Sequence, residues 1–339
     1  MKTAPRLPYQ PPTPRGPAPG IGFIGCGGIA AWHLTAYRDA GWPVRVLCSR
    51  DASKASDRRD EFFPDAEIAT DWREVVERDD IGIIDATPHP EQRAPIVEGA
   101  LRSGKHVLSQ KPFVNDLDLG ARLCDLADAE GLKLAVNQNG RFAPHLSWMR
   151  CAANSGLVGA IQSIDVSIHW DHNWIAGTAF DDTPDLLLHD FGIHWVDFIQ
   201  SLMGDRPVKT TASDVRRSAS QRAKPPLQGE ACVRYEGARA TLTFNGDSPS
   251  FSRDTTIIVG SEGVLESTGP DLDNQKVTLH RGGESCSPAL EGRWFPDGFR
   301  GAMGDLICAI EDDRTPLCDG RSNLASLSLC RRIIDGHPA

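Results

Sequence analysis

The chain has 339 residues, enough for about two domains of ordinary size. Apolar residues make up 40% of it and charged residues 24%, which excludes a largely disordered, collagenous or coiled-coil protein. The 36 Lys and Arg residues against 46 Asp and Glu residues give a net charge of −10. Because an acidic surface repels phosphate backbones and anionic lipids, we expect neither a nucleic-acid partner nor a membrane partner. No apolar run approaches the roughly 18 residues that a membrane helix needs.

The first 19 residues contain seven prolines and lack the apolar segment of a secretory signal. We expect residues 1–19 to form an extended, flexible arm, with docking onto a partner subunit as the alternative. The nine cysteines are an odd number, and the closest two are ten residues apart. This spacing fits no C-x-x-C zinc or redox motif. We therefore expect reduced thiols and a cytoplasmic location.

Strand-like and helical patterns alternate over the first part of the chain, up to residue 137. Helical spacing of Ile29, Trp32, Ala36 and Ala40 marks the expected buried face of the first helix. The alternation favours a parallel sheet covered by helices on both faces. The patterns predict strands at 20–25, 43–48, 81–86, 105–109 and 132–137, and helices at 28–41, 52–63, 71–78, 90–103 and 115–130.

The pattern changes near residue 140. Runs of alternating polarity then dominate, and six or seven of them follow without a helix between them. Such a series predicts one large, mostly antiparallel sheet. We expect an α/β protein with a nucleotide-binding domain at 20–140 and a substrate-binding and oligomerisation domain at 141–339. In the second domain the patterns predict helices at 145–155, 186–203, 298–312 and 321–335, and strands at 161–171, 207–216, 229–235, 238–245, 254–260, 263–268 and 276–281.

A glycine-rich turn lies between the first strand and the first helix. Residues 25–30, GCGGIA, fit the G-x-G-x-x-G/A fingerprint of dinucleotide-binding proteins. Gly25 permits a tight turn, Gly27 lets a pyrophosphate approach the backbone, and Ala30 permits close packing of helix and strand. The helix N-terminus favours the anion. We expect the dinucleotide to contact Gly25, Gly27, Gly28 and Ile29.

The end of the second strand indicates which dinucleotide binds. An acidic residue usually holds the 2′-hydroxyl of NAD at this place. Here Ser49 and Arg50 end the strand, and Asp51 follows one or two residues late. A hydroxyl followed by a guanidinium suits the 2′-phosphate of NADP, so we favour NADP over NAD. In the alternative, Arg50 is a solvated loop charge or stacks on the adenine.

Four stretches of the chain resemble the glucose–fructose oxidoreductase and inositol dehydrogenase (Gfo/Idh/MocA) family: IGFIGCGGIAAWHL, IDATPHPEQRAPIVEGALRSGKHVLSQKP, NQNGRFAPH and LLLHDFGIHWVDFIQSLMG. The likeness covers nearly everything from Gly20 to the C-terminus. It implies an N-terminal Rossmann domain, followed by an α/β domain with a large, mostly antiparallel open sheet. Members of the family commonly oxidise or reduce sugars and cyclitols and often associate through that sheet. We therefore expect a sugar or cyclitol substrate and a homodimer or homotetramer.

Two positions depart from the pattern of the family. The family usually has Glu-Lys-Pro where this chain has Gln110-Lys111-Pro112, and Thr-Pro-Asn-x-x-His where it has TPHPEQ at 87–92. Gln110 accepts a hydrogen bond but carries no charge, which alters the electrostatics around Lys111 and leaves its position unchanged. The resemblance also implies cofactor contacts by Thr87, Pro88, Gln110, Lys111 and Asn137, in addition to Ser49 and Arg50.

Three residues form the predicted catalytic group. Asp190 and His194 lie four apart in a helical pattern, so both side chains should share one face. A neighbouring carboxylate tunes the imidazole of His194 for general base work near neutral pH. Lys111 follows the fourth strand at its carboxyl end, where ligands of open α/β sheets bind and where an ammonium can stabilise a developing alkoxide. The alternatives are a structural Asp–His pair and a surface lysine.

Substrate contacts are expected from residues that can read hydroxyl groups and from rings that pack on the apolar face of a sugar. The segment 169–174, HWDHNW, is rich in both. A zinc site is not expected, because no local ligand spacing such as H-x-x-x-H supports one and the lysine would compete electrostatically. Its ligands would be His169, His172, His189, Asp190 and His194. The expected substrate contacts are Lys111, Arg141, His172, Trp174, Asp190 and His194.

The favoured function is an NAD(P)-dependent oxidoreductase that moves a hydride between the nicotinamide and a hydroxyl-bearing carbon of a sugar or cyclitol. One alternative is a glycoside-processing enzyme that uses transient redox chemistry with a retained NAD. Copurified nucleotide and turnover without added cofactor would distinguish it. The other is a non-catalytic sensor of dinucleotide or sugar. The presence of Lys111, Asp190 and His194 together argues against a sensor.

Overall fold

The computed structural model describes residues 3–336, which form two compact units. The first unit comprises residues 11–142 and 294–324. The second comprises, among the described residues, 3–10, 143–293 and 325–336. Over the described part of the chain, no helix combines the length and the apolar content needed to cross a bilayer.

A six-stranded parallel sheet forms the centre of the first unit, in the order β3-β2-β1-β4-β5-β6. The order reverses between β1 and β4, and this switch point is where ligands of open α/β sheets bind. The predicted parallel sheet is therefore confirmed, with one short strand, β3, that the patterns did not predict. The strands are β1 (Ile21–Ile24), β2 (Val44–Cys48), β3 (Glu67–Ala69), β4 (Ile83–Ala86), β5 (His106–Ser109) and β6 (Leu134–Val136).

Short polar signals begin several helices of the first unit. The carboxylates of Asp51, Asp71 and Asp116 each accept a hydrogen bond from the backbone N–H two residues further on, which caps the helix that follows. Gly41, at φ +70°, ends the first helix in the left-handed conformation. The helices are α1 (Ala30–Ala40), α2 (Ala52–Phe62), α3 (Trp72–Val76), α4 (Pro90–Arg102) and α5 (Leu117–Ala129).

The buried face of α1 differs from the one predicted. Trp32 is 44% exposed and meets the ring of Phe295 edge-on, whereas His33, Leu34 and Tyr37 are fully buried. Helical periodicity selects apolar residues, and it therefore passed over the polar His33 and Tyr37. Their polar atoms have partners inside the sheet, which makes their burial possible.

Residues 294–324 belong to the first unit, although the predicted boundary assigned everything after 140 to the second. Helix α8 (Asp297–Glu311) buries Phe299, Met303 and Leu306 in the same apolar cluster as β1 and α1. The chain thus returns to the nucleotide-binding fold after the second sheet is complete. The apolar face of an amphipathic helix such as α8 does not indicate which sheet the helix packs on. The sequence pattern therefore does not predict that residues 294–324 belong to the first unit.

The second unit is built on an eight-stranded sheet in the order β14-β13-β12-β11-β7-β10-β9-β8. All neighbours are antiparallel except β7 and β10, so the predicted, mostly antiparallel sheet is confirmed. The short β14 was not predicted. The strands are β7 (Ile161–His169), β8 (Val208–Arg216), β9 (Gln228–Tyr235), β10 (Ala238–Asn245), β11 (Arg253–Gly260), β12 (Gly263–Gly269), β13 (Lys276–Arg281) and β14 (Glu284–Cys286).

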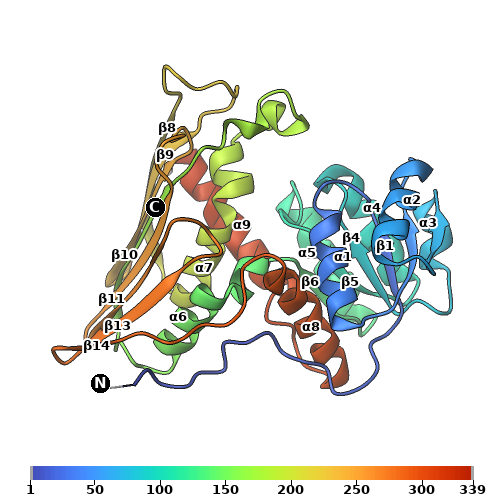
Figure 1. Cartoon of the computed structure of the whole chain (residues 1–339), viewed down its shortest axis with the longest axis horizontal. Coiled ribbons are helices and arrows are strands. Elements are labelled where there is room, and N and C mark those ends of the chain that lie inside the picture. Colours follow the sequence, from blue (N-terminus) through green and yellow to red (C-terminus); the bar gives the residue numbers. More distant parts are fainter. Residues whose placement is uncertain (1–2, 337–339) are drawn as a thin grey trace. The chain divides into compact units, whose positions relative to one another are not determined.

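Helices cover one face of this sheet. Figure 1 shows α6 (Pro144–Asn154), α7 (Ile193–Met203) and α9 (Gly320–Asp335) on the same side of it. Burial alternates along the strands accordingly. In β11, Thr256 and Ile258 are buried, and their neighbours Ile257 and Val259 are only partly covered. The second face of the sheet, with no helix of the described residues on it, is called the open face below.

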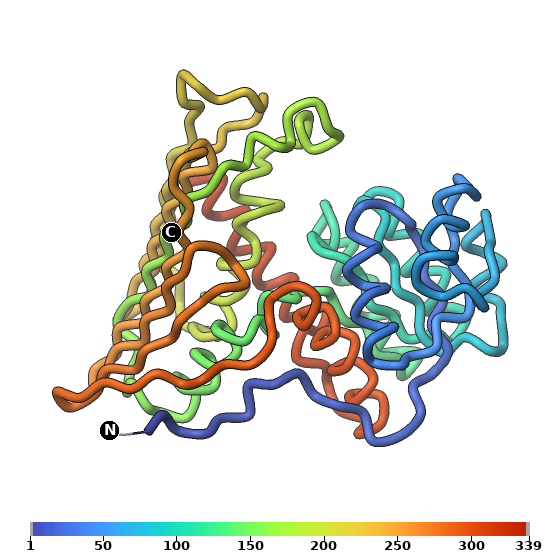
Figure 2. Tube along the Cα trace, viewed as in Figure 1, coloured from blue at the N-terminus to red at the C-terminus, as the bar shows by residue number. Residues whose placement is uncertain are grey.

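The proline-rich N-terminal segment is extended, as predicted, and residues 3–19 form neither helix nor strand (Figure 2). Hydrogen bonds hold it at separate points within each unit. In the second unit, Ser147 Oγ donates to the carbonyl of Tyr9 at 2.8 Å. In the first unit, the N–H of Gly16 donates to Glu311 at 2.8 Å. We expected a flexible arm, and these hydrogen bonds instead hold residues 9 and 16 of the segment against the protein.

Candidate functional site

The glycine-rich turn between β1 and α1 is locked by its contacts. Gly25 has φ +105°, and a Cβ there would lie 2.4 Å from Oγ1 of Thr87 and 2.9 Å from Cδ of Pro88. The Thr87 hydroxyl donates to the carbonyl of Gly25 at 2.7 Å. Thr87 and Pro88, at the end of β4, therefore support the turn directly, and any side chain at position 25 would disrupt it.

The rest of the turn fits a dinucleotide. A Cβ at Gly27 or Gly28 would meet no protein atom within 4 Å, so packing of the protein does not explain the two glycines. Ile29 provides no side-chain cap to α1, and that helix begins directly after β1, next to the switch point of the sheet. A pyrophosphate is the group that bare backbone and a helix N-terminus accommodate best. Nicotinamide dinucleotides, whose hydride chemistry resides in the nicotinamide ring, would be held here by Gly25, Gly27, Gly28 and Ile29.

The acidic residue after β2 is engaged in the protein itself. Asp51 accepts hydrogen bonds from the N–H of Ser53 at 3.1 Å and from its hydroxyl at 2.7 Å. These bonds to Ser53 lower the pKa of the Asp51 carboxyl. Arg50 is exposed and donates to Gln92 at 3.2 Å, and Ser49 is partly buried. Asp51 is thus engaged as the cap of α2, and Ser49 and Arg50 are the polar side chains that precede it at the end of β2.

A buried arginine organises the loop that carries Lys111. Arg93, 2% exposed on α4, donates from Nε to the carbonyl of Pro88 at 2.8 Å and from Nη1 to that of Pro112 at 2.5 Å. It also donates to the carbonyl of Gln110. The Lys111–Pro112 peptide bond is cis. Arg93 was not predicted from the sequence, although its helical spacing from the buried residues Val97, Ala100 and Leu101 is a signal that identifies it.

Gln110 connects this loop to the end of β6. Its Oε1 accepts a hydrogen bond from the N–H of Lys111 at 2.8 Å and a second from Nδ2 of Asn137 at 3.2 Å. Gln110 and Asn137 are buried, and Lys111 is partly exposed. Three residues predicted near the nicotinamide are therefore joined within the first unit. Arg141, predicted to contact substrate, is buried and donates to the carbonyl of Leu317 at 2.5 Å.

Asp190 and His194 do not share one continuous α-helix. The predicted helix 186–203 divides into a π-helical turn, Leu187–Phe191, and α7, which begins after Gly192. The N–H of Gly192 donates to the carbonyl of Leu187 at 2.8 Å, which is the five-residue bond of a π turn. Asp190 lies in this turn and His194 in the first turn of α7, both partly exposed. Simple α-helical spacing therefore does not describe the pair, although both lie in one short stretch.

A row of aromatic rings connects the predicted substrate residues to the π turn. The His172 ring stacks on Trp170 with centroids 5.5 Å apart and lies 5.0 Å from Phe191, the neighbour of Asp190. The Trp174 ring lies 5.1 Å from His172, and its Nε1 donates to Nδ1 of His172 at 3.3 Å. Trp174 is 58% exposed. His172 and Trp174 thus belong to the same part of the second unit as Asp190.

A buried asparagine holds the loop that carries Trp174. The side-chain carbonyl of Asn173 accepts bonds from the N–H groups of Arg222 and Ala223, at 2.8 and 3.2 Å. Its Nδ2 donates to Asp171 at 2.9 Å and to Asp247 at 2.6 Å. Four bonds on one buried amide fix this loop firmly, so the exposed ring of Trp174 is presented on a rigid support.

Within residues 3–336, no three His, Cys, Asp or Glu side chains are arranged to hold a metal ion.

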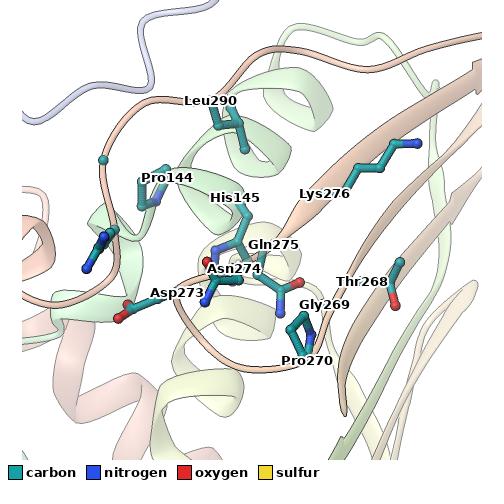
Figure 3. A pocket seen from close by; sticks show the side chains of 12 residues that line it. Pro144, His145, Thr268, Gly269, Pro270, Asp273, Asn274, Gln275, Lys276 and Leu290 are labelled. Atoms are coloured by element: carbon teal, nitrogen blue, oxygen red, sulfur yellow. The ribbon is translucent and has the colours of Figure 1, made fainter. Parts of the chain in front are cut away.

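The second unit contains a hollow of about 490 Å³. It lies between the start of α6, the turn from β12 to β13 and residues 290–293 (Figure 3). His145 lines it, and burial lowers the pKa of this imidazole to about 3. None of the predicted site residues lines the hollow, so it is separate from the candidate site.

The fold and the glycine turn define a dinucleotide-binding protein, and comparison with known families makes this specific. Residues 20–138 match the model of the oxidoreductase family with an NAD-binding Rossmann fold. Residues 147–266 match the GFO/IDH/MocA C-terminal domain. Because the two models together match well over half of the chain, it belongs to the GFO/IDH/MocA family of oxidoreductases.

Similar curated proteins include sugar and cyclitol dehydrogenases. A D-apiose dehydrogenase from Paraburkholderia graminis is 26% identical over 322 residues, which are 91% of this chain and 84% of the relative. An inositol 2-dehydrogenase from Rhizobium meliloti is 25% identical over 91% of this chain and 94% of its own. An uncharacterized oxidoreductase from Schizosaccharomyces pombe is 30% identical over 60% of this chain. In that case the match spans about half of the relative, 52% of its length.

Solved structures share the fold over nearly the whole chain. The scyllo-inositol dehydrogenase from Lactobacillus casei, solved with NAD(H) and scyllo-inositol, has a TM-score of 0.80 at 18% identity, covering 94% of this chain and 96% of that one. A 3-ketoreductase from Actinomadura kijaniata, solved with TDP-benzene and NADP, has a TM-score of 0.72 at 22% identity, covering 95% and 98%. At these identities the likeness concerns the fold.

Proposed function

We propose that this protein is an NAD(P)-dependent dehydrogenase or reductase that moves a hydride between the nicotinamide and a hydroxyl-bearing carbon of a sugar or cyclitol. The observation that carries the proposal is the arrangement of the first unit. A locked glycine turn fits the dinucleotide at the switch point of the sheet, and Lys111 lies directly after β5, on the same carboxyl edge. The names of the similar proteins, D-apiose dehydrogenase and inositol 2-dehydrogenase, support the substrate class.

The proposed reaction divides the work among three residues. The bound nicotinamide supplies a hydride acceptor at C4, so oxidation of a carbinol leaves one proton to be removed from its oxygen. His194 takes this proton as general base. The ammonium of Lys111 donates a hydrogen bond to the same oxygen and stabilises its negative charge. Asp190 orients His194.

The remaining predicted contacts recognise the substrate and the cofactor. We assign Arg141, His172 and Trp174 to the substrate, with the exposed Trp174 ring packing on the apolar face of a sugar. NADP is the favoured cofactor, because Asp51 is engaged as a helix cap and Arg50 offers a guanidinium to a 2′-phosphate. The open face of the second sheet is proposed to associate with a second copy of the chain, giving a homodimer or homotetramer.

Reduced-nicotinamide absorbance during incubation with NAD or NADP and a panel of sugars, cyclitols and polyols tests the function. We expect a rise with one subset of substrates, and its loss in Lys111→Met and His194→Gln variants that still bind nucleotide. Arg50→Ala should raise KM for NADP by roughly tenfold and leave KM for NAD nearly unchanged. Nucleotide bound to the purified protein without any rise would instead favour the retained-cofactor enzyme or the sensor.

A further inference from the structure

A buried chain of hydrogen bonds extends from the loop of Lys111 into the centre of the sheet. Nδ2 of Asn137 bonds Oε1 of Gln110 at 3.2 Å and Nε2 of His33 at 3.1 Å. Nδ1 of His33 bonds the carboxylate of Asp85 at 2.8 Å. His33, Asp85 and Asn137 are fully buried, and Gln110 is 6% exposed. The chain thus joins α1, β4 and β6 to the loop after β5.

The donors and acceptors along this chain have only one consistent arrangement. The carboxylate of Asp85 accepts, so Nδ1 of His33 carries the proton and donates it. Nε2 of His33 is then an acceptor and receives one N–H of the Asn137 amide. The second N–H of that amide goes to Gln110, whose Oε1 also receives the N–H of Lys111. The carboxylate at one end and the backbone N–H of Lys111 at the other therefore require the same direction for every bond between them.

The orientation of the Asn137 amide depends on this direction. Its Oδ1 is buried and has no hydrogen-bond partner among residues 3–336, so no contact of that atom fixes the amide. The two N–H bonds to His33 and Gln110 alone hold it. If the proton of His33 moved to Nε2, a donor would face the Asn137 N–H, and the amide would rotate. Rotation would place an oxygen against Oε1 of Gln110 and break the link to Lys111.

We propose that Asp85 and His33 are positioning residues that fix the side-chain amides of Asn137 and Gln110 and, through them, Lys111. The inference rests on the role proposed above for Lys111. It also explains the departure of this chain from the Glu-Lys-Pro pattern. A glutamate at position 110 would add a second carboxylate to the row of hydrogen bonds that already contains Asp85. In this protein the neutral Gln110 ends that row, and its one carboxylate, Asp85, lies inside the sheet.

The test uses Tyr37→Phe as a common background. The Tyr37 hydroxyl donates to Asp85 at 2.5 Å and lies 3.2 Å from Nδ1 of His33, where it could replace the carboxylate as an acceptor. In this background, residue 85 is the acceptor for His33. Asp85→Asn keeps an acceptor oxygen, and Asp85→Val removes it while retaining a residue type that suits a buried strand. His33→Leu provides a second way of interrupting the chain.

We expect kcat to fall roughly tenfold or more in Tyr37→Phe/Asp85→Val and in His33→Leu, as expected for a displaced catalytic group. Tyr37→Phe and Tyr37→Phe/Asp85→Asn should stay within roughly threefold of the wild type, although both lose thermal stability. Nitrogen-15 NMR of labelled histidine should show the proton of His33 on Nδ1 in the wild type and in the asparagine variant, and its loss from Nδ1 in the valine variant. Equal kcat in the asparagine and valine variants, or an unchanged tautomer in both, would overturn the proposal.

The two proposals fail in different ways. Wild-type protein that binds nucleotide but turns over no substrate would contradict the proposed function. The NMR readout needs no turnover and still decides whether Asp85 sets the tautomer of His33. Conversely, active wild type with an active valine variant would contradict the positioning role and leave the oxidoreductase intact. Thermal melting shows whether each variant folds. Because Tyr37→Phe/Asp85→Val and His33→Leu interrupt the hydrogen bonds independently, the test still works if one of the two does not fold.

Discussion

A guanidinium that is 2% exposed is costly to bury, and Arg93 donates to carbonyl oxygens of the backbone at Pro88, Gln110 and Pro112. A planar fork of N–H donors suits several carbonyls that lie around it. Those carbonyls belong to the loops after β4 and β5, which carry Pro88 and Lys111. This one residue of α4 thus sets the shape of the edge of the sheet where the dinucleotide is proposed to bind.

Replacing Arg93 by Lys should therefore do more than remove a surface charge. A lysine ammonium cannot reach all of these carbonyls, and each buried acceptor left without a donor costs about 1–3 kcal/mol. We expect a loss of roughly 2–4 kcal/mol in the free energy of unfolding and weaker nucleotide binding. Urea denaturation and titration with NADP measure the two effects. Arg102→Lys is the control, since this exposed arginine of the same helix makes a surface ion pair with Glu98, worth at most about 0.5 kcal/mol. Equal losses in both variants would contradict the argument.

Asp254 is a buried acid in the second unit. It is 2% exposed on β11, and its Oδ2 has no hydrogen-bond partner among the described residues. Burial, together with the charge of Asp271, raises the pKa of its carboxyl from 3.8 to about 7. The folded protein therefore holds this proton over a pH range in which the unfolded chain has released it. Stability is highest below pH 4 as far as this group is concerned, and it falls as pH rises from about 4 to about 7.

The predicted consequence is a pH-dependent gain in stability for Asp254→Asn. The asparagine is neutral at every pH, so it avoids the cost of ionising the carboxyl, which is on the order of 4 kcal/mol above pH 7. We expect the variant to be more stable than the wild type at pH 8 and about equal to it at pH 4. Urea denaturation of both proteins across this range gives the difference. A difference that does not change with pH would show that Asp254 titrates normally.

At the scale of elements, the sequence predicted most helices and strands within a few residues. Helix α5 was accessible because an aspartate cap and an apolar stripe mark it, and α2 because an aspartate cap begins it. The buried face of α1 was not, because His33 and Tyr37 are polar and their partner Asp85 lies 48 or more residues away. The π turn before α7 was not predicted either. It differs from an α-helix by one backbone bond, and no residue type signals that bond.

Gly192 maintains this π turn, and its replacement should disturb the pair Asp190 and His194. A Cβ at position 192 would lie 3.0 Å from the carbonyl oxygens of Leu187 and Leu188, closer than such contacts normally are. Relief requires the turn to move, which changes how Asp190 is placed relative to α7. We expect Gly192→Ala to lower kcat by roughly tenfold, as a small misplacement of catalytic groups does. The matched control is Gln200→Ala, further along the same helix. Steady-state kinetics measures this. A lower kcat for Gly192→Ala with unchanged nucleotide affinity would support the argument, and a kcat equal to that of Gln200→Ala would contradict it.

At the scale of the whole molecule, the sequence identified two folding units and their sheet types, and both sheets are confirmed. The return of residues 294–324 to the first unit was not accessible, since α8 packs through apolar residues that would suit either sheet. The glycine turn was accessible as a sequence motif, whereas Lys111, Asp190 and His194 stay predictions that rest on residue types and their spacing. The residues that support them, Arg93, Asn173 and the pair His33 and Asp85, were missed because their roles arise from contacts between distant elements.

The open face of the second sheet provides the last prediction. Ile257, on β11, lies on this face next to Val259, which pairs with Val264 of β12. Apolar side chains on a broad strand surface are the usual basis of association between copies of a chain. We expect the wild type to sediment as a homodimer or homotetramer. Ile257→Asp should shift it to monomer, because the new carboxylate would lie between its cross-strand neighbours Asp165 and Glu266, and association would bury these like charges together. Thr210→Asp, at the edge strand β8 and opposite Arg234 of β9, is the control and should leave the assembly intact. Sedimentation velocity at several protein concentrations measures the outcome. A monomeric wild type, or an Ile257→Asp variant that remains assembled, would show that the chain does not associate through this face.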